Sequence, residues 1–409
     1  MNIDTSKIQR LLTINQAFKP SSPIDQVNLF AGRVDQIDRM VNAITQTGLH
    51  VILYGERGVG KTSLVSILRD IFSQGKAPSA FLFTRINCEK QQTFGDLWKH
   101  VLSEIKLSYE LPSIGLSPDQ KHNKNITAFD LINSTNLAPE DIRILFEQIP
   151  LHPVIILDEL DRISDPSTIS SLADTVKTLS DHSSRVTLIL VGVADSVNEL
   201  LGDHLSVIRA IVQIPLPRMS NIKLHEVLDK SLREAQMTML DDAKAQIVNL
   251  SKGLPHYTHL LGLHAARRAN DDNRSEITID DLVEAIKTAT EEIDQSLKSN
   301  YVTAIQTSRK ATMHEIILLA CAIAQTNELG FFTAGAVKQQ LTRLTGKTIE
   351  IGSFALHLTD FSSDKRGNIL QRKGKERNYQ YRFVNTLMQP YVIMRGIEKG
   401  LIRYETIEE

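Results

Sequence analysis

The chain has 409 residues, an apolar fraction of 42% and a formal net charge of −2 at pH 7. This length is too great for one compact core and predicts two or three domains. No apolar run approaches the roughly eighteen residues that span a membrane, and the N-terminus lacks the features of a signal peptide. The only cysteines, Cys88 and Cys321, have neither disulfide nor zinc-ligand spacing. We therefore expect a cytoplasmic globular protein that does not contact membranes.

The near-neutral net charge hides an uneven distribution. Residues 308–409 contain 15 Lys and Arg against 10 Asp and Glu, whereas the rest of the chain contains 31 against 38. A cationic end favours a polyanionic partner. An ordinary charged surface would also explain a difference of this size.

The first 30 residues are expected to form an extended leader, because Pro20 and Pro23 disfavour helix. From residue 31, apolar runs alternate with amphipathic segments. That alternation predicts an α/β nucleotide-binding domain over residues 31–217, with a parallel sheet and helices on both faces. The expected strands are residues 49–54, 80–86, 154–158, 186–191 and 211–214.

A polar stretch at 107–136 interrupts this domain and has the composition of an insertion. After Pro217 the strand pattern stops, and helical periodicity predicts an all-α lid over residues 218–307. Its expected helices are residues 220–236, 241–251, 256–269 and 279–298.

The last predicted domain is residues 308–409. Three helices are expected near residues 313–325, 333–344 and 353–361, followed by a hairpin of residues 369–372 and 379–383. Three helices followed by a hairpin is the element order of a winged helix.

The strongest motif is the glycine-rich run Gly-Glu-Arg-Gly-Val-Gly-Lys-Thr, which lies between a predicted buried strand and an amphipathic helix. Its glycines allow backbone N–H groups to converge on phosphate oxygens at the start of a helix. Lys61 would reach the β- and γ-phosphates of ATP, and the Thr62 hydroxyl would ligate Mg²⁺. The predicted ATP-binding residues are Gly55, Glu56, Arg57, Gly58, Val59, Gly60, Lys61, Thr62 and Ser63.

A second motif, Val154–Asp161, is an apolar strand that ends in acidic residues. The carboxyl ends of parallel strands are where open α/β sheets bind ligands. We expect Asp158 to complete the Mg²⁺ shell and Glu159 to activate the attacking water as general base. Asp161 and Arg162 are expected to pair at the start of the next helix. Together the two motifs predict a slow ATPase with ATP and Mg²⁺ as cofactors.

With these motifs the chain resembles the AAA+ superfamily, in particular the branch of the origin-recognition and cell-division-control initiators and their STAND-like bacterial relatives. Residues Leu29–Arg33 are similar to the short box that flanks the adenine in that branch, although a turn packing under the first strand is an equal alternative. The resemblance implies a P-loop domain, a helical lid and a winged helix, in that order.

The resemblance also implies three further site residues. Asp195 stands at the sensor 1 position, where the family usually has Asn, and an Asp there would repel the γ-phosphate. Arg209 stands at the position of the arginine finger, which enters the site of a neighbouring subunit and so implies a homo-oligomer; a surface salt bridge is the alternative. His256 stands at the sensor 2 position, where an imidazole would replace the forked guanidinium of an Arg.

In the winged-helix interpretation, residues 353–361 are the groove-facing helix and residues 364–383 the wing. Ser353, His357 and Thr359 are the polar positions of that helix, and Asp360 would be repelled by phosphate. A cationic run favours a polyanion through counterion release. The predicted DNA contacts are Lys365, Arg366, Arg372, Lys373, Lys375 and Arg377.

Two functions therefore stay open. The first is an ATP-dependent switch that associates with double-stranded DNA through the winged helix. The second is a STAND-like signalling adaptor whose winged helix docks a protein partner, with little ATP turnover and no DNA binding.

Overall fold

The structure is a computed structural model, whose contacts divide the chain into two compact units. The first, here the helical unit, comprises Met1–Gly32, Glu56–Gly60 and Pro217–Glu409; the second, here the sheet unit, comprises Arg33–Gly55 and Lys61–Leu216. The structure describes residues 5–24, 30–74, 80–111, 122–132, 137–202, 205–306, 313–327, 329–375 and 378–403.

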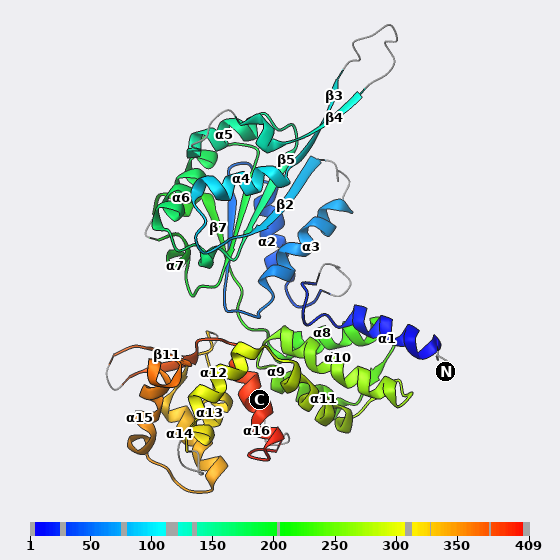
Figure 1. Cartoon of the computed structure of the whole chain (residues 1–409), viewed down its shortest axis with the longest axis vertical. Helices are drawn as coiled ribbons and strands as arrows, with labels where there is room; N and C mark the ends of the chain where they lie inside the picture. The colour runs from blue at the N-terminus through cyan, green and yellow to red at the C-terminus, as the bar shows by residue number, and fades with distance from the viewer. Residues whose placement is uncertain are drawn as a thin grey trace. The chain divides into compact units, whose positions relative to one another are not determined.

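A five-stranded parallel sheet forms the centre of the sheet unit, in the order β2-β5-β6-β1-β7 (Figure 1). Each strand coincides with a predicted apolar run to within two residues. β1, β5 and β6 are buried along nearly their whole length, as expected for parallel strands covered on both faces, whereas β2 is only partly buried. The predicted parallel α/β sheet is therefore confirmed. The strands are β1 (His50–Tyr54), β2 (Phe81–Asn87), β5 (His152–Asp158), β6 (Thr187–Gly192) and β7 (Ile211–Pro215).

Helices cover both faces of this sheet (Figure 1). On one face, α4, α5 and α6 enclose a core around Trp98, whose side chain is fully buried. Side-chain caps fix two of their starts: Thr93 accepts from the backbone N–H of Asp96, and Asp165 accepts from two backbone N–H groups. The helices are α2 (Val34–Ile44), α3 (Lys61–Ser73), α4 (Phe94–Glu104), α5 (Pro139–Glu147), α6 (Pro166–Asp181) and the short α7 (Val197–Leu201).

The polar stretch expected to be an insertion contains an antiparallel hairpin, β3 (Lys106–Leu111) with β4 (His122–Thr127). Figure 1 shows this hairpin extending away from the body of the sheet unit. Residues 112–121 and 133–136 of the stretch lie outside the described residues.

The helical unit contains the predicted helices after Pro217, with one difference. The helix expected over residues 279–298 is broken, because the Asp294 side chain caps a new helix by accepting from the backbone N–H groups of Ser296 and Leu297. A two-residue parallel pair, β8 (Thr238–Met239) with β9 (Glu276–Ile277), also joins segments expected to be purely helical. The helices are α8 (Asn221–Glu234), α9 (Asp241–Ser251), α10 (Pro255–Asp271), α11 (Ile279–Glu292) and α12 (Gln295–Ile305).

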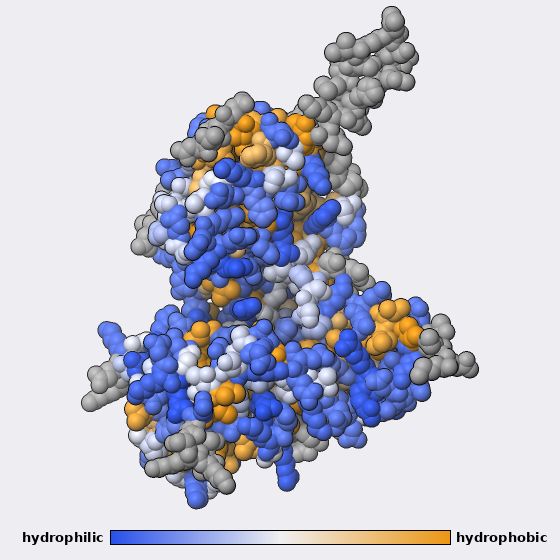
Figure 2. Space-filling view, viewed as in Figure 1, coloured by the Kyte–Doolittle hydropathy of each residue, from blue (hydrophilic) through white to orange (hydrophobic). Residues whose placement is uncertain are grey.

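The extended leader is wrong for residues 5–17, which form helix α1 (Thr5–Ala17). Pro20 lies beyond the end of this helix and does not disturb it. The helix is stabilised by burial, since Ile14, Ala17 and Phe18 are almost fully buried. Gly262 of α10 provides the space for the Phe18 ring, since a Cβ there would collide with it. An apolar stripe on the other side of α1 is exposed and visible in Figure 2; it consists of Ile8, Leu11 and Leu12.

The C-terminal part has the three predicted helices, α13 (Met313–Ile323), α14 (Ala334–Thr345) and α15 (Ile351–Phe361). The predicted hairpin joins a third strand in an antiparallel sheet of order β10-β12-β11. Contacts do not separate this part from the preceding helices, so the boundary at residue 308 stays a prediction. The strands are β10 (Phe332–Thr333), β11 (Leu370–Lys373) and β12 (Gln380–Phe383).

A last helix, α16 (Met388–Glu398), follows the hairpin and was not expected from the sequence. It is buried along most of its length, and it lies beside α13 and α11. Cys321 of α13 and Cys88 after β2 are both free and buried. Within the part of the chain that the structure describes, no helix combines the length and apolarity needed to cross a bilayer.

Candidate nucleotide site

The two residues predicted to hold Mg²⁺ lie next to each other in the sheet unit. Thr62 is in the first turn of α3, and Asp158 is the last residue of β5. The Thr62 hydroxyl donates to the Asp158 carboxylate over 3.0 Å. Hydroxyl and carboxylate oxygens are the ligands that Mg²⁺ prefers. The donor set therefore fits the predicted metal.

Asp158 has a further partner that the sequence analysis did not identify. Arg85 of β2 places its guanidinium 3.0 Å from the carboxylate oxygen that also accepts from Thr62. Its other terminal nitrogen donates to the Ser66 hydroxyl. The sequence did contain a signal for this partner: Arg85 lies inside a run predicted to be a buried strand, and a charge in such a strand needs a partner.

Glu159, the predicted general base, has an unusual backbone conformation. Its φ of 57° and ψ of 39° lie in the left-handed region, which costs a non-glycine residue energy and recurs at functional sites. Arg162 donates to its carboxylate over 2.8 Å. The expected pair between Asp161 and Arg162 is therefore wrong. The short 3₁₀ turn puts residues three apart side by side, and Asp161 instead accepts from the backbone N–H of Val193.

The side chain of Lys61 curls back over the P-loop. Its ammonium donates to the carbonyl oxygen of Gly55 over 2.8 Å and is nearly buried. Gly55 has a φ of 152°, and a Cβ there would collide with the carbonyl oxygen of Leu216, so only glycine fits. Because Lys61 begins α3, its backbone N–H lies at the positive end of that helix.

The other end of the P-loop belongs to the helical unit. Arg218, which follows β7, donates to the Glu56 carboxylate over 2.6 Å, and both side chains are about nine-tenths buried. The same guanidinium donates to the side-chain oxygen of Gln389 over 2.6 Å and to the carbonyl oxygen of Lys252 over 3.3 Å. Burial, with Arg218 as the second cause, lowers the pKa of Lys252 to about 8.

The next two P-loop residues contact the segment that leads into α16. The Thr386 hydroxyl donates to the carbonyl oxygen of Arg57 over 2.6 Å. Gly58 has a φ of 84°, and a Cβ there would lie 2.9 Å from the Leu387 side chain. Tyr257 of α10 donates its hydroxyl to the carbonyl oxygen of Leu387. Nothing in the sequence indicated that residues near 387 meet the P-loop.

Two of the three residues inferred from the resemblance have local partners. Asp195 lies three residues beyond β6, and its backbone N–H donates to the Glu199 carboxylate. Arg209 forms an ion pair with Asp181 at 2.6 Å, with its side chain 75% exposed. Their roles as sensor 1 and arginine finger stay predictions.

His256, at the sensor 2 position, is largely buried near the start of α10 and faces the N-terminal segment. Its Nδ1 lies 2.9 Å from the carbonyl oxygen of Pro20. A carbonyl only accepts, so Nδ1 carries the proton. Burial lowers the pKa of His256, the bond to Pro20 raises it, and Arg57 lowers it. The neutral ring then offers Nε2 only as an acceptor, so a bond to phosphate requires protonation.

The predicted DNA contacts differ in their surroundings. Lys365 pairs with Asp360 at 3.3 Å, which offsets the acid expected to repel phosphate. Arg366 donates to the carbonyl oxygens of Ala304 and Gln306 on the α12 side. Lys375 is exposed, and Arg377 lies outside the described residues.

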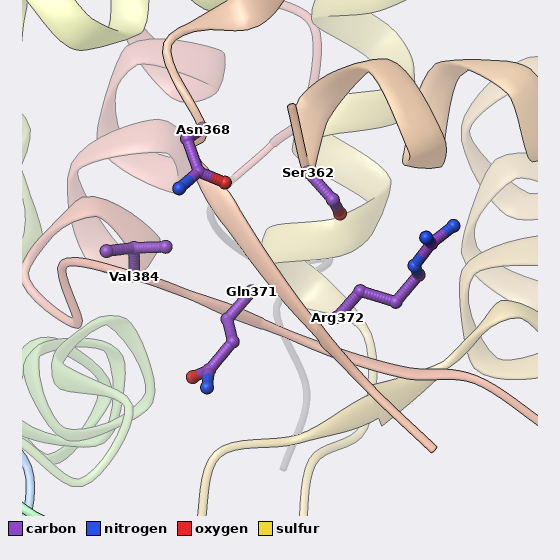
Figure 3. A pocket seen from close by; sticks show the side chains of 5 residues that line it. All are labelled: Ser362, Asn368, Gln371, Arg372 and Val384. Carbon is purple, nitrogen blue, oxygen red and sulfur yellow. The ribbon is translucent and has the colours of Figure 1, made fainter. Parts of the chain in front are cut away.

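The remaining two cations, Arg372 and Lys373, stack near aromatic rings. The Arg372 guanidinium lies 4.5 Å from the Tyr379 ring centre, and the Lys373 ammonium lies 5.7 Å from that of Phe331. Arg382, which the sequence analysis missed, lies 4.6 Å from the same Phe331 ring. A pocket of about 550 Å³ lies beside this sheet, lined by Ser362, Asn368, Gln371, Arg372 and Val384 (Figure 3).

The expected groove-facing helix, α15, presents few free polar groups. The hydroxyls of Ser353 and Thr359 donate to carbonyl oxygens of Glu350 and Ala355. His357 lies against His314 of α13, with ring centres 4.6 Å apart. Among its exposed residues are the apolar Ile351 and Leu356.

Comparisons with known proteins find a domain match and similar folds. Residues 44–201 match the family described as AAA domain. The Walker-type ATPase paby2304 of Pyrococcus abyssi has a similar structure, with a TM-score of 0.51, 15% identity, and coverage of 91% of this chain and 98% of that one. The ORC2 protein of Aeropyrum pernix gives a TM-score of 0.50, 13% identity, and coverage of 94% and 98%. A search of curated proteins finds no match.

Proposed function

Since this chain carries an AAA domain and has the AAA+ fold of the origin-recognition proteins, we propose that it is an ATP-binding and ATP-hydrolysing switch that associates with DNA. The observation that carries the ATPase part is the 3.0 Å bond between Thr62 and Asp158, followed directly by Glu159. The Aeropyrum pernix protein of the same fold was solved as ADPNP and ADP complexes.

The residues of the sheet unit divide the work at the nucleotide. Lys61, which donates to the Gly55 carbonyl here, would reach the β- and γ-phosphates of bound ATP, and Thr62 and Asp158 would hold Mg²⁺, which would neutralise charge on those phosphates. Arg85 neutralises Asp158 in this structure, because its guanidinium contacts the carboxylate oxygen that accepts from Thr62. A metal ion at that oxygen would repel the guanidinium, so holding Mg²⁺ there would require Arg85 to release it.

Glu159 accepts the proton of the attacking water. It directly follows the last residue of β5 and has a left-handed backbone. Its carboxylate is about half exposed, so water can reach it. Arg162 donates to this carboxylate and so occupies one of its oxygens. Slow turnover follows if Arg162 has to release Glu159 first.

The DNA part of the proposal rests on the aromatic and cationic surface of the β10-β12-β11 sheet, whose charged residues include Arg372, Lys373 and Arg382. Alternating guanidinium, ammonium and aromatic groups suit phosphates and bases better than they suit an acidic protein surface. The winged helix that the resemblance implies would present this surface as its wing.

One observation favours the adaptor as second candidate. In α15 the exposed residues include Ile351 and Leu356, and the hydroxyls of Ser353 and Thr359 are bonded to their own helix. Such a face suits an apolar protein partner more than base edges.

ATP turnover measured with and without duplex DNA tests the proposal. Lys61→Ala should weaken ATP binding roughly 10- to 100-fold, because it removes a charged hydrogen-bond donor. Glu159→Gln should retain ATP affinity and lower turnover by about 10²- to 10⁴-fold. Glu104→Gln, an exposed change on α4, is the matched control. Unchanged turnover in Glu159→Gln would remove Glu159 from its role.

Salt titrations of duplex binding separate the two candidates. Changing Arg372, Lys373 and Lys375 to Gln should flatten the slope of log affinity against log salt by roughly 2–3 units. The control triple, Lys338, Arg343 and Lys347 to Gln on or beside α14, changes the charge equally and should leave the slope unchanged. Absence of duplex binding by the wild type would contradict the DNA part and favour the adaptor.

A further inference from the structure

Arg218 connects segments of the helical unit that are far apart in the chain. It follows β7, and it donates to Glu56 of the P-loop and to Gln389 of α16, both over 2.6 Å. Its third contact is the carbonyl oxygen of Lys252, in the turn between α9 and α10. One guanidinium thus joins the P-loop, the helices after β7 and the last helix of the chain.

Burial makes these bonds hard to replace. The Arg218 and Glu56 side chains are 10% and 7% exposed, so water can satisfy little of either charge if they separate. A guanidinium has fixed donor directions, so its position is set by its partners. When one partner moves, Arg218 has to move with it or leave a buried donor unpaired.

Gln389 is itself fixed at its other end. Its side-chain nitrogen donates to the carbonyl oxygen of Ala322 in α13 over 2.8 Å, and the residue is 2% exposed. The position of the amide oxygen that accepts from Arg218 therefore depends on how α16 packs against α13. Thr386, which precedes α16, donates to the carbonyl oxygen of Arg57 and adds a direct contact to the loop.

The backbone at Gly330 packs closely against the Arg218–Glu56 pair. Gly330 lies against it with a φ of 73°, and a Cβ there would be 2.5 Å from the Glu56 carboxylate and 2.7 Å from the guanidinium. A Cβ at Gly58 would lie 2.9 Å from the Leu387 side chain. Closely packed contacts of this kind transmit a displacement instead of absorbing it.

We propose that Arg218 is a positioning residue of the nucleotide site, which sets the P-loop through Glu56 and takes its own position from Gln389 of α16. ATP affinity then depends on a helix more than 300 positions along the chain from the P-loop. By linkage, ATP also changes the stability of the α16 contacts. This inference deepens the proposed function and rests on its ATP site.

Gln389→Ala and Thr386→Val test the proposal without touching the P-loop sequence. Binding of a fluorescent ATP analogue with Mg²⁺ is measured for each. Both should weaken binding at least about fivefold, the lower end of typical coupling between two sites. Gln339→Ala, an exposed glutamine on α14 of the same unit, is the matched control and should bind like the wild type.

A double-mutant cycle identifies Arg218 as the intermediary. Glu56→Ala removes the acceptor for Arg218, so adding Gln389→Ala to it should weaken binding little further. Hydrogen exchange at saturating ATP supplies a second readout: ATP should slow exchange at residues 386–389 in the wild type, and less in Glu56→Ala.

Three results would count against the proposal. Wild-type affinity in folded Gln389→Ala and Thr386→Val would overturn the dependence on α16, and strictly additive losses in the cycle would overturn the role of Arg218. A wild-type chain that does not bind the analogue would overturn the proposed function itself. Binding by the wild type therefore separates the two failures.

Discussion

Two carboxylate–arginine pairs, one in each unit, differ in how exposed their arginine is. In the sheet unit, Asp158 is 3% exposed and its partner Arg85 is 31% exposed. In the helical unit, Glu56 and Arg218 are both enclosed, and Arg218 has further partners on α16 and in the turn before α10. The same pair of chemical groups thus occurs once with a partly solvated arginine and once with a buried one.

This difference shows how burial decides the use of an ion pair. A partly exposed guanidinium recovers hydration when it leaves, so Asp158 can exchange it for a metal ion at moderate cost. A buried guanidinium has no such alternative, and breaking its pair leaves an uncompensated charge. The first pair suits ligand exchange, and the second suits fixed geometry.

The largest expected effect is on the free energy of unfolding when the arginine of each pair is replaced by alanine. Arg218→Ala should lower the free energy of unfolding by about 3–5 kcal/mol, because the buried Glu56 carboxylate loses its buried ion-pair partner. Arg85→Ala should cost less, about 1–3 kcal/mol, because the buried Asp158 carboxylate keeps its bonds to the Thr62 hydroxyl and the Glu159 N–H. Urea unfolding at pH 7 measures both. Equal losses would contradict the distinction between the pairs.

A buried group without any counter-ion sharpens the comparison. His50 of β1 is fully buried, and its Nδ1 accepts from the backbone N–H of Leu188. Burial, followed by the nearby His152, lowers its pKa to about 3. The unfolded chain takes up a proton below about pH 6.5 and the folded chain does not, so stability falls as the pH falls from 6.5 towards 3.

At about 1.4 kcal/mol for each pH unit, this contribution at pH 5 is a loss of about 2 kcal/mol relative to pH 7. His50→Gln keeps a side-chain acceptor and removes the titration. Its loss of unfolding free energy between pH 7 and pH 5, measured in urea, should be smaller than that of the wild type by this amount. Parallel pH profiles for the two proteins would show that His50 is protonated in the folded state.

The smallest expected effect is on the competition between Arg85 and Mg²⁺ for the Asp158 carboxylate. Arg85→Gln removes the cation that competes for the carboxylate, so half-saturation of ATP-analogue binding should need about three- to tenfold less Mg²⁺. Arg39→Gln on α2, whose guanidinium bonds to the Gln213 carbonyl instead, is the control. A higher Mg²⁺ requirement in Arg85→Gln would mean that Arg85 assists the metal or the phosphates.

Much of the sheet unit could be predicted from the sequence, because β1, β5 and β6 are buried nearly throughout and are continuous apolar runs, and the partly exposed β2 is still mostly apolar. The meeting of Thr62 and Asp158 followed from the same rule, since carboxyl ends of parallel strands share one edge. Arg85 was visible as a charge within such a run and was not used.

The helical unit was harder to predict, for physical reasons. Helix α1 depends on burial of Phe18 against Gly262, a contact that no local pattern contains. Arg218 and its partners Glu56 and Gln389 are separated by 162 and 171 positions. Only the folded chain brings such residues together, and none belongs to a motif that assigns its partner.

The burial of the two cysteines has a practical consequence for labelling the protein. Burial, followed by the nearby Asp158, raises the pKa of the Cys88 thiol to about 12, and burial also raises that of Cys321. Neither forms appreciable thiolate at neutral pH, and both are shielded from alkylating reagents. A single cysteine introduced at the exposed Lys375 would therefore react alone with a maleimide dye, which makes the unmodified background suitable for site-specific fluorescence on the hairpin.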